Sequence, residues 1–97
     1  MTMLKVPIHP GEILKHEFLV EMGMSAGKLA RHLGVPRTRI ERLCDEETSV
    51  TIDTATRLAT ALGTTVEFWM NLQLNHDLAK EVAKIDVSHI SRLIAAE

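Results

Sequence analysis

Cysteine is nearly absent from this chain. The only one among the 97 residues is Cys44, so no disulfide can form within the molecule. A single thiol is typical of a protein in a reducing compartment, which predicts a cytoplasmic location. The chain begins Met-Thr-Met-Leu-Lys without the apolar stretch of a signal peptide, and no hydrophobic run is long enough to cross a membrane. We therefore expect no membrane partner.

Arrangements of residues for metal or catalytic chemistry are also missing. The five histidines, at positions 9, 16, 32, 76 and 89, do not have the spacing of metal ligands. His16-Glu17 begins like a zinc-protease motif, but Val20 occupies the position of the second histidine. No glycine-rich phosphate loop and no pair of carboxylates that indicates a pocket occurs. The sequence predicts a protein that is not an enzyme and holds no metal or cofactor.

Aromatic residues and strand patterns are scarce as well. Only Phe18, Phe68 and Trp69 are aromatic, and no segment alternates polar and apolar residues for long enough to form a strand. Because 45% of the residues are hydrophobic, the chain can nevertheless bury a core. These features predict one all-α domain over residues 1–97, with Trp69 in its core and Cys44 in a packing role.

Five helices are expected from the apolar spacing and the residues at helix ends. The first runs from Pro10 to about Glu21 and is ended by Gly23. Its buried face is predicted from the spacing of Leu14, Phe18 and Met22. Thr51 begins the fourth helix, which Gly63 ends, and its apolar face comprises Ile52, Ala55, Leu58, Ala59 and Leu62.

A longer fifth helix and a tail follow, over residues 65–97. Thr64 and Glu67 have the spacing of a capping box at the start of this helix. The helix carries the apolar residues Phe68, Trp69, Leu72, Leu78, Ala79 and Val82. The tail is expected to hold a short turn of helix, capped by Asp86 or Ser88, through Ile90, Leu93 and Ile94.

Residues 25–44 have the pattern of a helix-turn-helix, the second and third helices of the domain. Ser25 is a typical cap for the first of these two helices, and Gly34 can adopt the positive φ that ends it. Pro36 falls where the second begins, a position that tolerates a missing N–H. A shared apolar contact is expected among Leu29, Leu33, Val35, Ile40 and Leu43. This spacing is typical of a DNA-binding unit.

Charge is unevenly distributed along the chain. From Ser25 to Leu43 the formal charge is +4, whereas the whole chain carries −2, so the remaining residues sum to −6. The positive charges of this segment are Lys28, Arg31, Arg37, Arg39 and Arg42. A basic stripe on an otherwise acidic protein indicates contact with nucleic acid.

Four segments together resemble the HigA-type (VapI-like) antitoxins of the Xre/Cro helix-turn-helix superfamily. They are the residues from His9 to Leu14 with Glu17-Phe18-Leu19, the helix-turn-helix, the stretch from Thr51 to Leu58, and above all Thr65-Val66-Glu67-Phe68-Trp69-Met70-Asn71-Leu72-Gln73. The resemblance implies a five-helix lambda-repressor-like domain with a short C-terminal tail. It further implies an antitoxin that represses its own operon and neutralises a small basic toxin, a ribosome-dependent mRNA-cleaving enzyme.

The resemblance assigns base reading to the start of the third helix. Arg37, Thr38 and Arg42 lie close to one face, where arginine can donate two hydrogen bonds to guanine and threonine can contact a base or phosphate. Arg39 points elsewhere and is expected, like Lys28, to contact phosphate. The expected partner is double-stranded DNA carrying an inverted repeat, bound by a homodimer whose two recognition helices are about 34 Å apart.

Two departures from the family pattern bear on DNA binding. Ala26 stands where relatives usually carry a glutamine that braces a phosphate, and Gly27 beside it weakens the helix by roughly 1 kcal/mol. Asp45, Glu46 and Glu47 replace an Asn-Gly pair followed by basic residues. These carboxylates repel phosphate, which predicts weak or partner-dependent binding. The alternatives are a toxin-binding protein with little operator binding and a stand-alone or phage-type repressor.

Overall fold

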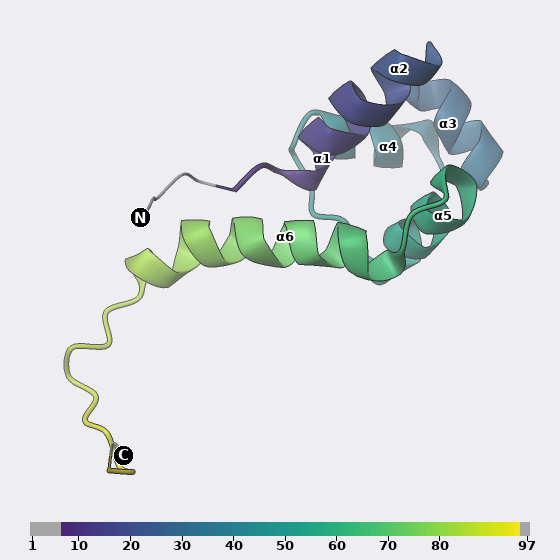
Figure 1. Ribbon diagram of the computed structural model, residues 1–97. Helices are drawn as coiled ribbons and strands as arrows, with labels where there is room; N and C mark the ends of the chain where they lie inside the picture. Colours follow the sequence, from purple (N-terminus) through teal and green to yellow (C-terminus); the bar gives the residue numbers. More distant parts are fainter. Residues whose placement is uncertain (1–6, 96–97) are drawn as a thin grey trace.

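Residues 7–95 are described in the computed structural model and contain helices but no strands. The first helix is continuous and consists of α1 (Pro10–Ile13), the π-helical segment η1 (Leu14–Leu19) and α2 (Val20–Met22). It is followed by α3 (Ala26–Leu33), α4 (Arg37–Cys44), α5 (Ile52–Leu62) and α6 (Val66–Glu81), to which the 3₁₀ turn η2 (Val82–Lys84) is joined (Figure 1). The expected all-α, five-helix architecture is confirmed. None of the helices in this part of the chain is both long and apolar enough to span a membrane.

The core lies between the first helix, the α3–α4 pair and the start of α6. Its buried side chains include Leu14, Leu19, Leu29, Leu33, Ile40, Leu43, Val50, Ala55, Leu58 and Trp69. Trp69 is fully buried, and its indole N–H donates to Thr64 Oγ1 at 2.7 Å. Gly11 brings the backbone of α1 against α4, since a Cβ at this position would lie 1.7 Å from the carbonyl oxygen of Leu43. This contact fixes α4 against the N-terminal helix.

Two buried polar side chains hold the connections around this core. His9 caps α1 through Nδ1, which accepts from the Gly11 N–H at 2.9 Å, and its ring meets His76 of α6 edge-on at 4.8 Å. Burial, followed by the neighbouring His76, lowers the pKa of His9. Gln73 of α6 accepts from the Val50 N–H at 2.7 Å and so anchors the segment between α4 and α5.

The first helix buries a different face from the one predicted. Leu14 and Leu19 are buried, Phe18 is half-buried, and Met22 is 45% exposed. The cause is the π-helical segment, whose wider turn places residues five apart on the same side of the helix. A spacing of four therefore predicted the wrong face for Met22.

The structure corrects three predictions about the first residues of helices: where α4 begins, which residue caps α6, and whether Ile52 is buried. Pro36 is the N-cap of α4, with ψ of 144°, and the first helical residue is Arg37. Thr65, whose Oγ1 accepts from the Phe68 N–H at 3.0 Å, caps α6, because the hydroxyl of Thr64 accepts from the Trp69 indole instead. Ile52 is 67% exposed, so it does not belong to the buried face of α5.

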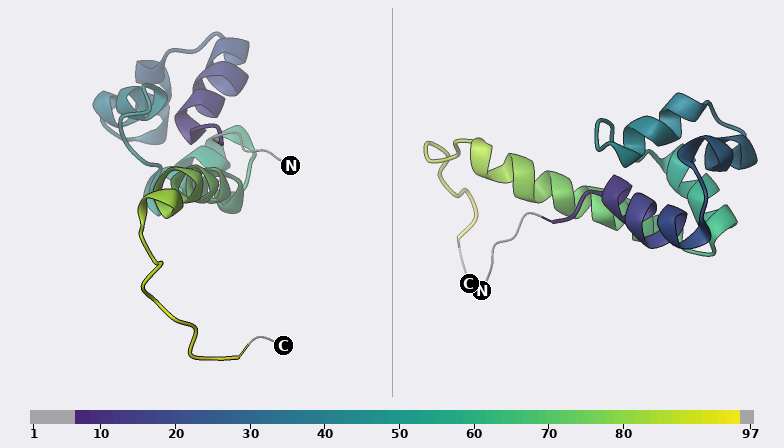
Figure 2. Two further views of the ribbon diagram at one scale, coloured as in Figure 1. Left: turned by 90° about the vertical axis from the view of Figure 1, so that its left-hand side faces the viewer. Right: turned by 90° about the horizontal axis from the view of Figure 1, so that it is seen from above.

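The second half of α6 and the tail extend away from the other helices (Figure 2). Leu78 and Val82 are exposed here, although the sequence placed them with the apolar residues of this helix. No helix forms over residues 86–95, so the expected last turn of helix is wrong for that range, while residues 96 and 97 lie outside the described part. Asp86 does accept from the Ser88 N–H, at 3.0 Å, but within an isolated turn.

Candidate nucleic-acid interface

The exposed surface of the helix-turn-helix is formed by α4. Ile40, Leu43 and Cys44 are buried and hold α4 against α3 and the first helix. Ser25 caps α3 by accepting from the Lys28 N–H at 3.1 Å, and Gly34 ends it with a φ of 75°. The opposite side of α4 exposes the four residues predicted to meet DNA, Arg37, Thr38, Arg39 and Arg42.

Lys28 and Arg37 lie together in a groove between α3 and α4. This α3/α4 groove has a volume of about 720 Å³ and is lined by Ser25, Gly27, Lys28, Arg31, Val35 and Arg37. A Cβ at Gly27 would lie 2.9 Å from Cδ of Arg37, so glycine makes room for the stem of that arginine. Arg37 Nε pairs with Glu41 Oε2 at 3.3 Å along the helix. Glycine at this position, despite its low helix propensity, lets the Arg37 side chain lie against α3.

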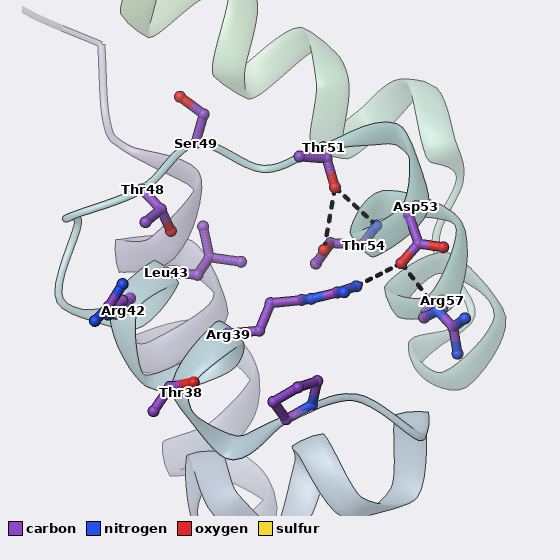
Figure 3. A pocket seen from close by; sticks show the side chains of 11 residues that line it. Thr38, Arg39, Arg42, Leu43, Thr48, Ser49, Thr51, Asp53, Thr54 and Arg57 are labelled. Atoms are coloured by element: carbon purple, nitrogen blue, oxygen red, sulfur yellow. Dashed lines mark hydrogen bonds and ion pairs between the residues drawn. The ribbon is translucent and has the colours of Figure 1, made fainter.

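Thr38, Arg39 and Arg42 lie on the other side of α4, in a groove that faces α5 (Figure 3). This α4/α5 groove has a volume of about 460 Å³, and its lining also includes Thr48, Ser49, Thr51 and Asp53. It combines guanidinium groups with hydroxyl groups, both of which are donors to phosphate oxygens. The five predicted site residues are therefore divided between two grooves, with the recognition helix between them.

Arg39 has a partner that the sequence analysis missed. Its Nη1 donates to Asp53 Oδ2 in the first turn of α5, and the same oxygen accepts from Arg57 Nε at 3.1 Å. Arg57 also donates to the carbonyl of Leu33 at 2.8 Å, at the end of α3. The hydrogen bonds from Arg39 and then Arg57 lower the pKa of Asp53, so its carboxylate is charged at neutral pH. The spacing of Asp53 and Arg57 predicts their own i, i+4 pair, but nothing local indicates Arg39.

The acidic residues after α4 form an exposed turn. Asp45, Glu46 and Glu47 are all exposed, and Glu46 has a φ of 63°, a left-handed conformation that is unfavourable for a residue with a Cβ. The Glu47 N–H donates to the carbonyl of Arg42 at 2.9 Å and closes the helix end. Three carboxylates thus lie directly beyond the C-terminus of the recognition helix.

Neither a reactive cysteine nor a metal site is indicated in the described part of the chain. Burial raises the pKa of the Cys44 thiol, which makes it a poor nucleophile at neutral pH. Across residues 7–95 no group of three or more metal-ligating side chains is brought together.

Comparisons with known proteins identify the family. The helix-turn-helix family profile matches residues 16–69, more than half of the chain. Virulence-associated protein I of Dichelobacter nodosus is 41% identical over 87 residues, which cover 90% of this chain and 79% of that protein. Antitoxin HigA-1 of Vibrio cholerae is 43% identical over 72 residues, which cover 74% of this chain and 68% of the relative.

A solved structure agrees with these sequence matches. Pseudomonas aeruginosa antitoxin HigA, solved with the higBA promoter, superimposes with a TM-score of 0.85 at 37% identity, covering 92% of this chain and 99% of that one. The similarity includes both the helix-turn-helix and α6, since it extends over most of each chain. The chain therefore belongs to the helix-turn-helix family, in the group that contains the HigA antitoxins.

Proposed function

We propose that this protein is a DNA-binding antitoxin that represses its own operon and neutralises the toxin encoded with it. The observation that carries the proposal is the recognition helix α4, which exposes Arg37, Thr38, Arg39 and Arg42 in a chain similar to an antitoxin solved with promoter DNA. Family membership also agrees with the expectation that the chain is not an enzyme. The protein acts in the cytoplasm, where its promoter and its toxin are both accessible.

In the proposed complex, α4 lies in the major groove. Arg37, Thr38 and Arg42 read base edges, Lys28 contacts a phosphate on one flank of α4, and Arg39 faces the DNA backbone on the other flank. Lys28 and Arg39 lie in different grooves, one on each flank of α4, which supports an approach of the DNA backbone on both sides of this helix. Since one helix reads few base pairs, the operator is an inverted repeat bound by a homodimer.

The dimer is supported by the exposed apolar surface of α6 and η2. Leu74, Leu78, Val82 and Ile85 are about half or more exposed. The spacing of four places the first three along one side of the projecting helix, and Ile85 follows directly after η2. Such a stripe is costly in water and is buried when two copies pack together. Light scattering should give a dimer at tens of micromolar concentration, and a monomer with and without DNA would contradict this assignment.

The proposed function is tested by binding a duplex from the chain's own promoter region and a random duplex of equal length. If the dimer neutralises about six phosphates, log K falls with log salt at a slope near −5. Arg42→Ala should lose about 1–3 kcal/mol on the promoter duplex and little on the random one, whereas Lys28→Ala should weaken both alike. Absence of any DNA binding at low salt would refute repression by this protein.

The second candidate is a toxin-binding protein with little operator binding. The exposed turn of Asp45, Glu46 and Glu47 favours it, because like charge near the recognition helix opposes docking on phosphate. In this case the basic toxin adds positive charge, and DNA affinity rises only in the complex. Titrating promoter DNA with antitoxin, with and without the protein of the neighbouring reading frame, distinguishes the two candidates.

A further inference from the structure

The carboxylate of Asp53 lies between two guanidinium groups beside the recognition helix (Figure 3). Its Oδ2 accepts from Arg39 of α4 and from Arg57 of its own helix. Arg57 is in turn held by the carbonyl of Leu33 at the end of α3. The result is a row of contacts from α3 through α5 to α4, which ends on the side chain of Arg39.

We propose that Asp53 is a positioning residue: by accepting from Nη1 of Arg39 it keeps the guanidinium in the α4/α5 groove and competes with a DNA phosphate for it. Arg39 then adds little to the affinity for DNA of arbitrary sequence. Discrimination between operator and other DNA is left to the base-reading residues of α4. This inference rests on the proposed function, since it concerns how the protein engages DNA.

Carboxylate and phosphate are competing partners for one guanidinium group, because both are anions that accept charge-assisted hydrogen bonds from its N–H groups. Asp53 is ionised at neutral pH and lines the same groove as Arg42, so it also repels a phosphate that approaches this groove. Arg57 partly compensates this negative charge. The three charges of Arg39, Asp53 and Arg57 together leave +1, where two free arginines would present +2.

The contact between Asp53 and Arg39 is accessible to DNA. The Arg39 side chain is 41% exposed and that of Asp53 is 54% exposed, so neither is closed off by the core. Asp53 retains a partner without Arg39, because Arg57 lies four residues later on the same helix. DNA can therefore displace Asp53 from Arg39 while the ion pair between Asp53 and Arg57 within α5 is kept.

Asp53→Asn tests the inference, since it keeps the side-chain shape and removes the charge. Binding of the full chain is measured on the promoter-region duplex and on the random duplex over a range of salt. Each dimer would release two arginines, which makes the slope of log K against log salt steeper by about 2. Raising the salt from about 50 to 200 mM then weakens random-DNA binding about tenfold more than it does for the parent. At low salt both duplexes bind more tightly by a similar factor, because a phosphate contact carries no sequence information, and the ratio of promoter to random affinity stays near the parental value.

Two further variants show whether the effect of Asp53→Asn on DNA binding depends on Arg39. Glu81→Gln removes a carboxylate that pairs with Lys84 at 3.8 Å, on the part of α6 that projects from the domain, and frees one cation there. It matches Asp53→Asn in charge and should leave the salt slope at the parental value. Arg39→Ala should weaken random-DNA binding clearly in the Asp53→Asn background and little in the parent.

The outcomes separate the inference from the proposed function. If the parent binds DNA and Asp53→Asn has the slope of Glu81→Gln, or if Arg39→Ala costs the same in both backgrounds, the inference is overturned. If Asp53→Asn loses its helical circular dichroism, the contact is structural and the inference is likewise overturned. If the parent binds neither duplex at low salt, the proposed function fails, and the inference fails with it.

Discussion

Replacing Glu46 with glycine is expected to stabilise the domain. Gly23, Gly34 and Gly63 end α2, α3 and α5 in the left-handed conformation, with φ of 61°, 75° and 73°, and Glu46 has the same role after α4 at 63°. At all four ends the following N–H donates to a carbonyl five residues earlier, so the closing motif is the same. Of these four positions, only that of Glu46 has a Cβ.

The magnitude follows from three opposing contributions. A left-handed conformation costs a residue with a Cβ about 1–2 kcal/mol. A carboxylate beyond a helix C-terminus adds about 0.3–1 kcal/mol of unfavourable interaction with the helix dipole. Glycine's greater freedom in the unfolded chain opposes these gains by about 0.4–1 kcal/mol. We expect a net gain near 1 kcal/mol, which raises Tm by about 4–8 °C in a domain of this size.

Thermal and urea unfolding measure this gain, and two variants isolate its cause. Glu46→Ala removes the same charge but keeps the Cβ, so it should remain about 1 kcal/mol less stable than Glu46→Gly. Gly63→Ala is the reverse experiment, because a Cβ there meets no atom within 4 Å and the loss comes from conformation. Equal stability of the glycine and alanine variants at position 46 would refute the reasoning from backbone strain.

Three further changes test the buried contacts. Burial lowers the pKa of His9 in the folded protein, so the contribution of neutral His9 to stability is complete above about pH 6.5 and is lost as the pH falls toward the folded pKa. His9→Asn keeps a capping acceptor and should flatten that loss in unfolding experiments from about pH 7.5 to 5. Gln73→Leu leaves the buried Val50 N–H without its acceptor and should cost about 1–3 kcal/mol in urea unfolding, so a variant as stable as the parent would contradict the assigned bond. Trp69→Phe removes the indole N–H bond to Thr64 and leaves a cavity; the expected cost of about 1–3 kcal/mol can be read from the same experiment, and no loss would contradict the contribution assigned to the indole.

Local rules predicted most of the helix ends. Ser25 and Thr51 cap their helices, and Gly34 and Gly63 end theirs, because each depends on one hydrogen bond or one dihedral angle set by the residue itself. The same rules chose wrongly between Thr64 and Thr65. Both can cap α6, and the choice was settled by the indole N–H of Trp69, which lies in the core.

Features that depend on distant contacts were not predictable. The π-helical segment changes the buried face of the first helix, and no residue type in Leu14–Leu19 indicates a wider turn. The arginines of α4 could be identified from the pattern, but the partner of Arg39 could not, because Asp53 is 14 residues away and on another helix. The sequence therefore predicted which residues α4 exposes, but not the residues that orient their side chains.

The two halves of α6 differ in how firmly they are held against the rest of the protein. The first half of α6 is fixed by Trp69 and Gln73, which are buried, whereas in residues 74–81 only His76 is even half-buried. Helical turns with few buried contacts have low local stability, so in a single copy we expect the amides of these last turns to exchange faster than those of the first half. In the proposed dimer the partner covers these turns and stabilises them. Folding of the helix end and association of the two copies would then be one coupled transition, with a heat-capacity change larger than that of rigid docking.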